Sequence, residues 1–146
     1  MTFQITRRLC ACDRIALMAV TGNLHNGLGI VRGDVFSIRR TIDNIPAGRT
    51  LAEGWLTVKA AITDVDGSAT FQKVITVTDV AGTGQIEDTG ADGSGIIRFD
   101  ISATNSLAMT AGQSYFYDIQ IRLDSNDVLT LESGTTSAAA QITIDS

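Results

Sequence analysis

Residues 115–123 read Tyr-Phe-Tyr-Asp-Ile-Gln-Ile-Arg-Leu, and this stretch decides the fold class. Apart from Phe116, its apolar and polar side chains alternate, which is the pattern of a β-strand with one buried and one exposed face. The sequence therefore predicts a central strand that packs against a core on one side. The predicted core face comprises Tyr115, Tyr117, Ile119, Ile121 and Leu123, and the opposite face comprises Phe116, Asp118, Gln120 and Arg122.

The same period of two continues on both sides of this stretch. Short runs rich in Val, Ile, Thr and aromatic residues are separated by clusters of Gly, Asp, Asn and Ser. About seven strands with such spacing predict an all-β fold, an antiparallel two-sheet sandwich. Strands are expected at 35–42, 55–63, 69–77, 85–87, 97–101, 115–123, 128–132 and 140–144, with a hairpin turn at 64–67 and a helical turn within 106–112.

The chain divides into two parts. Its 146 residues have the length of one domain, and 44% of them are apolar, which is enough for a core. The first 32 residues differ from the rest, because an alternating segment is followed by a continuous apolar run and a glycine-rich stretch. We predict an extended N-terminal arm over residues 1–32 and a β-sandwich over residues 33–146. The arm either adds strands to its own sheets or pairs with a neighbouring subunit by strand addition.

The charges are distributed unevenly along the chain. Residues 1–50 carry a net charge of +4, and residues 51–146 carry −9. This split favours contact between copies or docking of the front segment on an acidic partner, and the alternative is that folding intermixes the charges. The overall charge of −5 disfavours contact with phosphates, so we expect no nucleic-acid partner. The candidate interface residues are Phe3, Ile5, Arg7, Arg8, Leu9, Arg14, Arg39 and Arg40.

Residues that carry chemistry are few. His25 is the single histidine and lies in a glycine-rich stretch without a serine nucleophile motif. Acidic residues occur in pairs within turn segments, where their side chains accept hydrogen bonds from local backbone amides. The sequence therefore predicts a protein that is not an enzyme and that has no cofactor and no metal. The acidic pairs are Asp64 and Asp66, Asp88 and Asp92, and Asp124 and Asp127.

A carbohydrate- or calcium-binding module is the alternative to a structural protein. The Asp-Val-Asp-Gly segment at 64–67 begins like a calcium loop, but Ile75 stands where such a loop has its glutamate. Tyr115, Tyr117 and Trp55 are candidates for a sugar-stacking platform, although packing in the core and on the sheet faces is favoured for them.

The sequence also indicates the cellular compartment in which the protein is made. Cys10 and Cys12 form a lone Cys-x-Cys, for which free thiols are favoured over an intermolecular disulfide or a metal site. No apolar run reaches the length of about 18 residues that a membrane span needs. Charged residues such as Arg7 and Arg8 interrupt any N-terminal signal peptide. We therefore expect synthesis and assembly in a cytoplasm and no membrane partner.

Four segments, in this order, carry a resemblance to a known family. They are Arg-Gly-Asp-Val-Phe-Ser-Ile at 32–38, the hairpin around 64–67, Gly-Ile-Ile-Arg-Phe-Asp at 95–100 and Ala-Gly-Gln-Ser-Tyr-Phe-Tyr-Asp-Ile-Gln at 111–120. The set resembles small virion proteins of tailed bacteriophages with an immunoglobulin-like sandwich, and it is similar to the N-terminal domain of the phage baseplate upper protein. The likeness covers residues 32–146.

The resemblance implies a non-catalytic structural protein of a bacteriophage virion, assembled in the host cytoplasm. No stem or receptor-binding region follows the sandwich in this sequence, which departs from the longer baseplate proteins. A capsid decoration (cement) protein, or a head or tail accessory protein that docks through its arm, is therefore expected, with a tail or baseplate adaptor as the alternative. The implied partners are further copies of the chain and other virion proteins, such as the major capsid or tail proteins.

Overall fold

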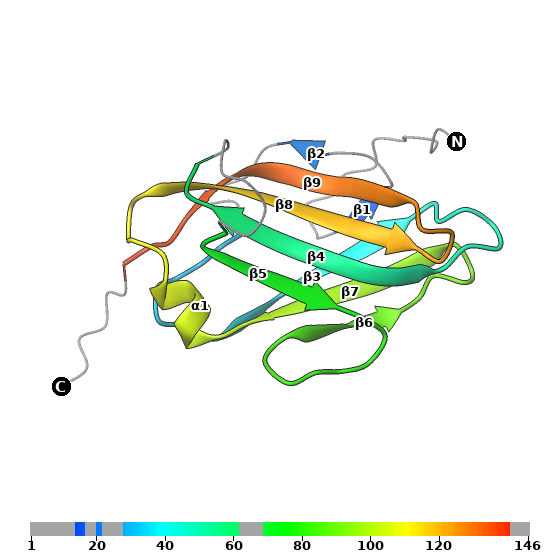
Figure 1. Cartoon of the computed structure of the whole chain (residues 1–146), viewed down its shortest axis with the longest axis horizontal. Helices are drawn as coiled ribbons and strands as arrows, with labels where there is room; N and C mark the ends of the chain where they lie inside the picture. The colour runs from blue at the N-terminus through cyan, green and yellow to red at the C-terminus, as the bar shows by residue number, and fades with distance from the viewer. Residues whose placement is uncertain (1–13, 17–19, 22–27, 62–68, 141–146) are drawn as a thin grey trace.

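The fold consists of two β-sheets that face each other (Figure 1). The computed structural model describes residues 14–16, 20–21, 28–61 and 69–140. One sheet has the order β1 (Arg14–Ala16), β3 (Phe36–Asp43), β7 (Ser94–Ile101) and β6 (Gly84–Asp88). The other has the order β2 (Val20–Thr21), β9 (Val128–Ser137), β8 (Ser114–Leu123), β4 (Leu51–Lys59) and β5 (Phe71–Ile75).

The predicted antiparallel two-sheet sandwich is confirmed. All pairs among β3 to β9 are antiparallel, and the short strands β1 and β2 add to β3 and β9 in parallel. The order β3-β7-β6 opposite β9-β8-β4-β5 is that of an immunoglobulin-like sandwich in which β5 extends the second sheet by one edge strand. The seven longer strands, β3 to β9, correspond in order to the first seven predicted ranges, from 35–42 to 128–132.

The core lies between the two sheets and follows the alternation of the sequence. Along β8 every second side chain is buried, from Tyr115 to Leu123, as its pattern predicts. The strand β7 behaves in the same way and buries Ile97, Phe99 and Ile101 completely. Side chains from two inner faces thus close over one apolar interior, and their removal from water is the main favourable contribution to folding.

Several element ends differ from the predicted ones. The strand β9 continues through Gly134 to Ser137, whereas the sequence predicted a break there, because the backbone of Gly134 pairs with Tyr117 of the long neighbour β8. The predicted helical turn is a short helix, α1 (Ala103–Leu107), that starts earlier because Ser102 and Asn105 form a capping box. The turn at 64–67 and residues 141–144 of the last predicted strand lie outside the described residues. In the described part of the chain no helix is long and apolar enough to cross a membrane.

Residues 28–32, at the end of the predicted arm, pack against the sandwich. Leu28 and Ile30 are buried, and Val31 forms a parallel bridge with Ala139 beyond the end of β9. The guanidinium of Arg32 donates a hydrogen bond of 2.7 Å to the Met109 carbonyl oxygen. Together with β1 and β2, these residues add to the chain's own sheets, one of the two arrangements considered for the arm. Pairing of residues 1–13, which are not described, with a neighbouring subunit stays a prediction.

A close backbone approach at the start of β6 requires glycine. Gly84 has a φ of +125°, and a Cβ atom there would collide with the carbonyl oxygen of Arg98 on β7. Gly82, two residues earlier, also has a positive φ of +77°, but a Cβ atom there would meet nothing within 4 Å. The two glycines therefore separate the cost of backbone conformation from the cost of the collision.

We predict that Gly84→Ala lowers the free energy of unfolding by about 3 kcal/mol, because β6 must move away from β7, whereas Gly82→Ala lowers it by about 1 kcal/mol. Urea unfolding of the two variants and the unsubstituted chain measures the difference. Equal losses in the two variants would contradict the assigned contact.

Candidate functional site

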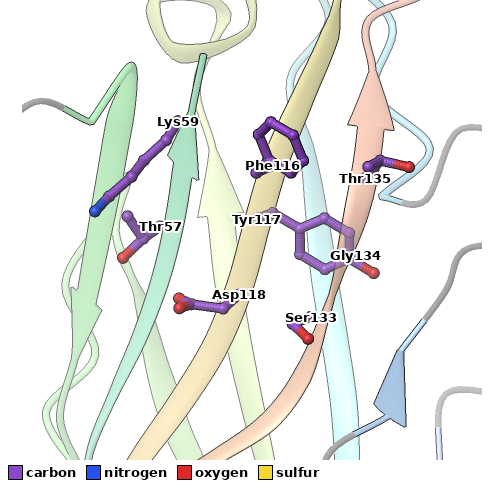
Figure 2. A pocket seen from close by; sticks show the side chains of 8 residues that line it. All are labelled: Thr57, Lys59, Phe116, Tyr117, Asp118, Ser133, Gly134 and Thr135. Carbon is purple, nitrogen blue, oxygen red and sulfur yellow. The ribbon is translucent and has the colours of Figure 1, made fainter. Parts of the chain in front are cut away.

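An open groove crosses the outer face of the five-stranded sheet, over the middle strands β4, β8 and β9 (Figure 2). Its volume is about 380 Å³. Such a volume falls within the range of small-molecule sites, roughly 300–1,000 Å³. The groove is lined by Thr57, Lys59, Phe116, Tyr117, Asp118, Ser133, Gly134 and Thr135.

The register of the sheet arranges six of these side chains in two adjacent rows. One row runs Lys59, Phe116, Thr135 across the three strands, and the next runs Thr57, Asp118, Ser133. Because side chains at every second position of a strand share a face, both rows project outward from the sheet. Figure 2 shows the Phe116 ring above the Asp118 carboxylate, which extends toward Thr57 on β4.

Tyr117 and Gly134 lie between the two rows of the groove and are paired with each other on β8 and β9. In Figure 2 the Tyr117 ring extends from β8 toward Gly134. The side chain of Tyr117 is buried in the core, so the ring lies on the opposite face of the sheet from Phe116 and Asp118.

The hydroxyl of Tyr117 belongs to a polar cluster between the two sheets. It donates a hydrogen bond of 2.5 Å to Oε2 of Glu132 on β9. The guanidinium of Arg40 on β3 donates to both carboxylate oxygens of Glu132, over 2.9 Å to Oε1 and 3.3 Å to Oε2. Only 17% of the Arg40 side chain and 10% of the Glu132 side chain are exposed. Burial and the bond to Glu132 raise the pKa of the Tyr117 hydroxyl well above its ordinary value of 10.0.

A β-bulge in β9 places the carboxylate of this cluster inside the sandwich. Ile119 pairs with Glu132, whereas the next residue of β8, Gln120, pairs with Thr130, so Leu131 is the extra residue. Leu131 and Glu132 are consecutive in sequence, and both are buried. Strict alternation would turn one of them outward. The burial of Glu132 therefore cannot be recognised from the alternation of the sequence.

The outer face of the other sheet carries a second network of charges. Arg98 on β7 forms ion pairs of 2.8, 2.7 and 3.0 Å with Asp79, Glu87 and Asp100. Arg39 on β3 joins the network through Glu87, at 2.6 Å. Hydrogen bonds to Asp100 and Glu87 raise the pKa of the Arg98 guanidinium above its ordinary value. The network ties β3, β6 and β7 together on their solvent side.

The structure places three of the predicted interface residues. Arg14 lies in β1, paired by its backbone with β3. Arg39 is 57% exposed and Arg40 is largely covered by the inter-sheet cluster. Three arginines of the basic segment 1–50 pair with acids of the acidic segment 51–146, so folding intermixes these charges. They are Arg39, Arg40 and Arg49. The other predicted interface residues, Phe3, Ile5, Arg7, Arg8 and Leu9, lie outside the described residues.

Of the remaining candidate residues, some lie in the described part of the chain and others lie outside it. Asp88 accepts a hydrogen bond from the Gly90 amide of its own turn, as predicted, whereas Asp124 accepts one from the amide of Thr50, 74 residues away in sequence. The favoured packing of Tyr115 and Tyr117 in the core is confirmed, and their side chains are too buried to form the alternative sugar-stacking platform. Within the described residues no group of three or more His, Cys, Asp or Glu side chains could hold a metal ion. Cys10, Cys12, His25, Asp64 and Asp66 lie outside the described residues.

Comparison with known proteins adds no relative. No protein-family model matches the chain, and no curated protein matches it significantly.

We predict that Arg40→Ala destabilises the fold by about 3 kcal/mol, because it leaves the Glu132 carboxylate buried without its cation. The double variant Arg40→Met/Glu132→Gln recovers most of this loss, since it removes both charges and keeps a carbonyl acceptor for Tyr117. Arg39→Ala, whose ion pair is exposed, costs less than about 1 kcal/mol. Urea unfolding of the three variants measures these values, and an equal loss in Arg40→Ala and Arg39→Ala would contradict the cluster.

The raised pKa of Tyr117 predicts a loss of stability at high pH. The folded state favours the neutral hydroxyl, so this contribution is complete below the unfolded pKa of about 10 and is lost as the pH rises through the higher folded pKa. We expect the free energy of unfolding to fall above about pH 10, and Tyr117→Phe to reduce that fall. Urea unfolding from pH 7 to 11 tests this, and identical pH profiles of the two proteins would argue against it.

Proposed function

We propose that this chain is a non-catalytic structural protein of a bacteriophage virion: a capsid decoration (cement) protein or a head or tail accessory protein. It assembles with further copies of itself and docks on other virion proteins. The proposal is supported by the immunoglobulin-like strand order together with the ordered set of segments that resembles phage virion proteins. A tail or baseplate adaptor is the nearest alternative.

The arrangement of the sheet edges is the observation that carries the docking part of the proposal. At one side of the sandwich the N-terminal strands β1 and β2 pair with β3 and β9. At the other side β5 and β6 end their sheets within the described part of the chain. An edge strand can accept a strand from another chain. The outer edge of β6 is already bonded, because the Ile86 amide donates to the Thr76 carbonyl oxygen and Gly84 pairs with Val80. The fold therefore supports strand addition between subunits at β5.

Exposed apolar side chains lie at the same side. Val74 on β5 is 40% exposed, and Val77 and Val80 between β5 and β6 are 51% and 47% exposed. Contact with another protein would remove this apolar surface from water. The alternating segment around Phe3, Ile5 and Leu9 has the pattern of a strand that fits such an edge.

The proposed docking segment is shorter than residues 1–32, because residues 28–32 pack against the sandwich. Removal of Ile30 would open the core, and removal of Arg32 would break its bond to Met109, so a deletion through residue 32 would unfold part of the sandwich. A deletion of residues 1–13 keeps every described residue.

We predict that purified particles made by the phage that encodes the chain contain the full-length protein and lack the variant without residues 1–13. Mass spectrometry of the particles measures incorporation, and thermal unfolding shows that the truncated sandwich remains folded. As a matched pair, Arg7→Ala/Arg8→Ala reduces incorporation, whereas Arg122→Ala, on the outer face of β8, does not. Absence of the full-length chain from the particles refutes the virion assignment, and undiminished incorporation of the truncated chain refutes docking through the N-terminal segment.

A further inference from the structure

We propose that the groove over β4, β8 and β9 binds a neutral saccharide. The proposal goes beyond the virion assignment and stands or falls separately from it. The groove has the volume of a small-molecule site and is open along one sheet face, a shape that admits one or two sugar units of a longer chain.

Phe116 supplies the apolar base of this site. Its side chain projects from the outer face of β8, where the sequence otherwise places Asp118, Gln120 and Arg122. The face of a sugar ring that carries C–H groups is apolar, and it packs on the flat face of an aromatic side chain. An aromatic ring among polar neighbours is thus suited to one face of a sugar.

The side chains around Phe116 supply the hydrogen bonds. Lys59 and Thr135 flank it in its own row, and Asp118 lies in the next row with Thr57 and Ser133. A carboxylate accepts hydrogen bonds, an ammonium group donates them, and a hydroxyl does both. This mixture is complementary to the hydroxyl groups of a sugar, each of which is both donor and acceptor.

Two features favour a neutral saccharide over other ligands. The backbones of β4 and β8 are paired with neighbouring strands on both sides, so a peptide cannot add to them as a further strand. The groove contains one carboxylate, of Asp118, and one ammonium group, of Lys59, so its charges balance, which favours a neutral ligand over a charged one.

The strands beneath the groove are held from the inner face of the sheet. Tyr117 on β8 is bonded through its hydroxyl to Glu132 on β9, and Glu132 is held by Arg40 of the opposite sheet. Strands fixed by such contacts keep their positions before a ligand arrives, which lowers the entropic cost of binding.

A test uses the full-length chain and defined neutral trisaccharides: cellotriose, maltotriose, triacetylchitotriose, mannotriose and xylotriose. Trp55, the single tryptophan, lies on β4 two residues from Thr57 and serves as a fluorescent reporter. Amide NMR spectra locate the site. We expect at least one trisaccharide to bind with a Kd of roughly 1 mM or below, with shifts concentrated at residues 57–59, 116–118 and 133–135.

Single variants show whether the saccharide binds in this groove or elsewhere on the sheet. Phe116→Ala weakens binding about tenfold, Phe116→Leu about fivefold because it keeps apolar bulk without a ring, and Asp118→Asn about fivefold. The leucine variant also serves if the alanine variant is unfolded. Val74→Ala, which shortens an exposed apolar side chain outside the groove, leaves binding unchanged.

Two results overturn the proposal. One is the absence of binding by all five trisaccharides at about 10 mM, where a ligand with a Kd of 1 mM would occupy most sites. The other is binding outside the groove. It would be seen if the folded Phe116→Leu and Asp118→Asn variants bind with undiminished affinity, or if the amide NMR shifts lie elsewhere on the chain. Particle incorporation of the same variants is unaffected in either case, so failure of the saccharide site leaves the virion proposal standing.

Discussion

The register in which β8 pairs between β4 and β9 is the constraint on which the rest of the structure depends. Because successive side chains of a strand point to opposite faces, one register sends Tyr115, Ile119 and Ile121 into the core and Phe116 and Asp118 to the outer face. A slip by one residue would exchange the two sets and expose the core. The same backbone pairing that closes the sandwich therefore also assembles the rows of the groove.

The polar cluster between the sheets is the part of the interior whose removal from water opposes folding. A buried ion pair loses its hydration, and the attraction between the charges offsets that loss only when the remaining hydrogen bonds are made. Here the guanidinium of Arg40 contacts both oxygens of Glu132, and Tyr117 donates to one of them. The cluster links β3 of one sheet to β8 and β9 of the other, so it restricts how the two sheets pack.

The proposed docking and ligand surfaces occupy different parts of the sandwich. Strand addition concerns β5, which ends its sheet within the described residues, whereas the groove lies over the middle of that sheet. A subunit that docks at an edge leaves the face of β8 and β9 uncovered. The charged network of Arg98 on the other sheet ties β3, β6 and β7 together, and through Asp79 it also reaches the segment that carries Val77 and Val80.

By itself, the sequence determined the fold class, the strand β8 and most of the core, because alternation with a period of two is a local property that burial on one face enforces. It also placed Phe116 and Asp118 on the outer face. Only the tertiary structure decided that Glu132 is buried, since a bulge interrupts the alternation there, and that Arg40 pairs with it from 92 residues away. The groove was equally beyond reach, because its rows are set by pairing between distant strands, and such contacts leave no periodic signal in any one segment.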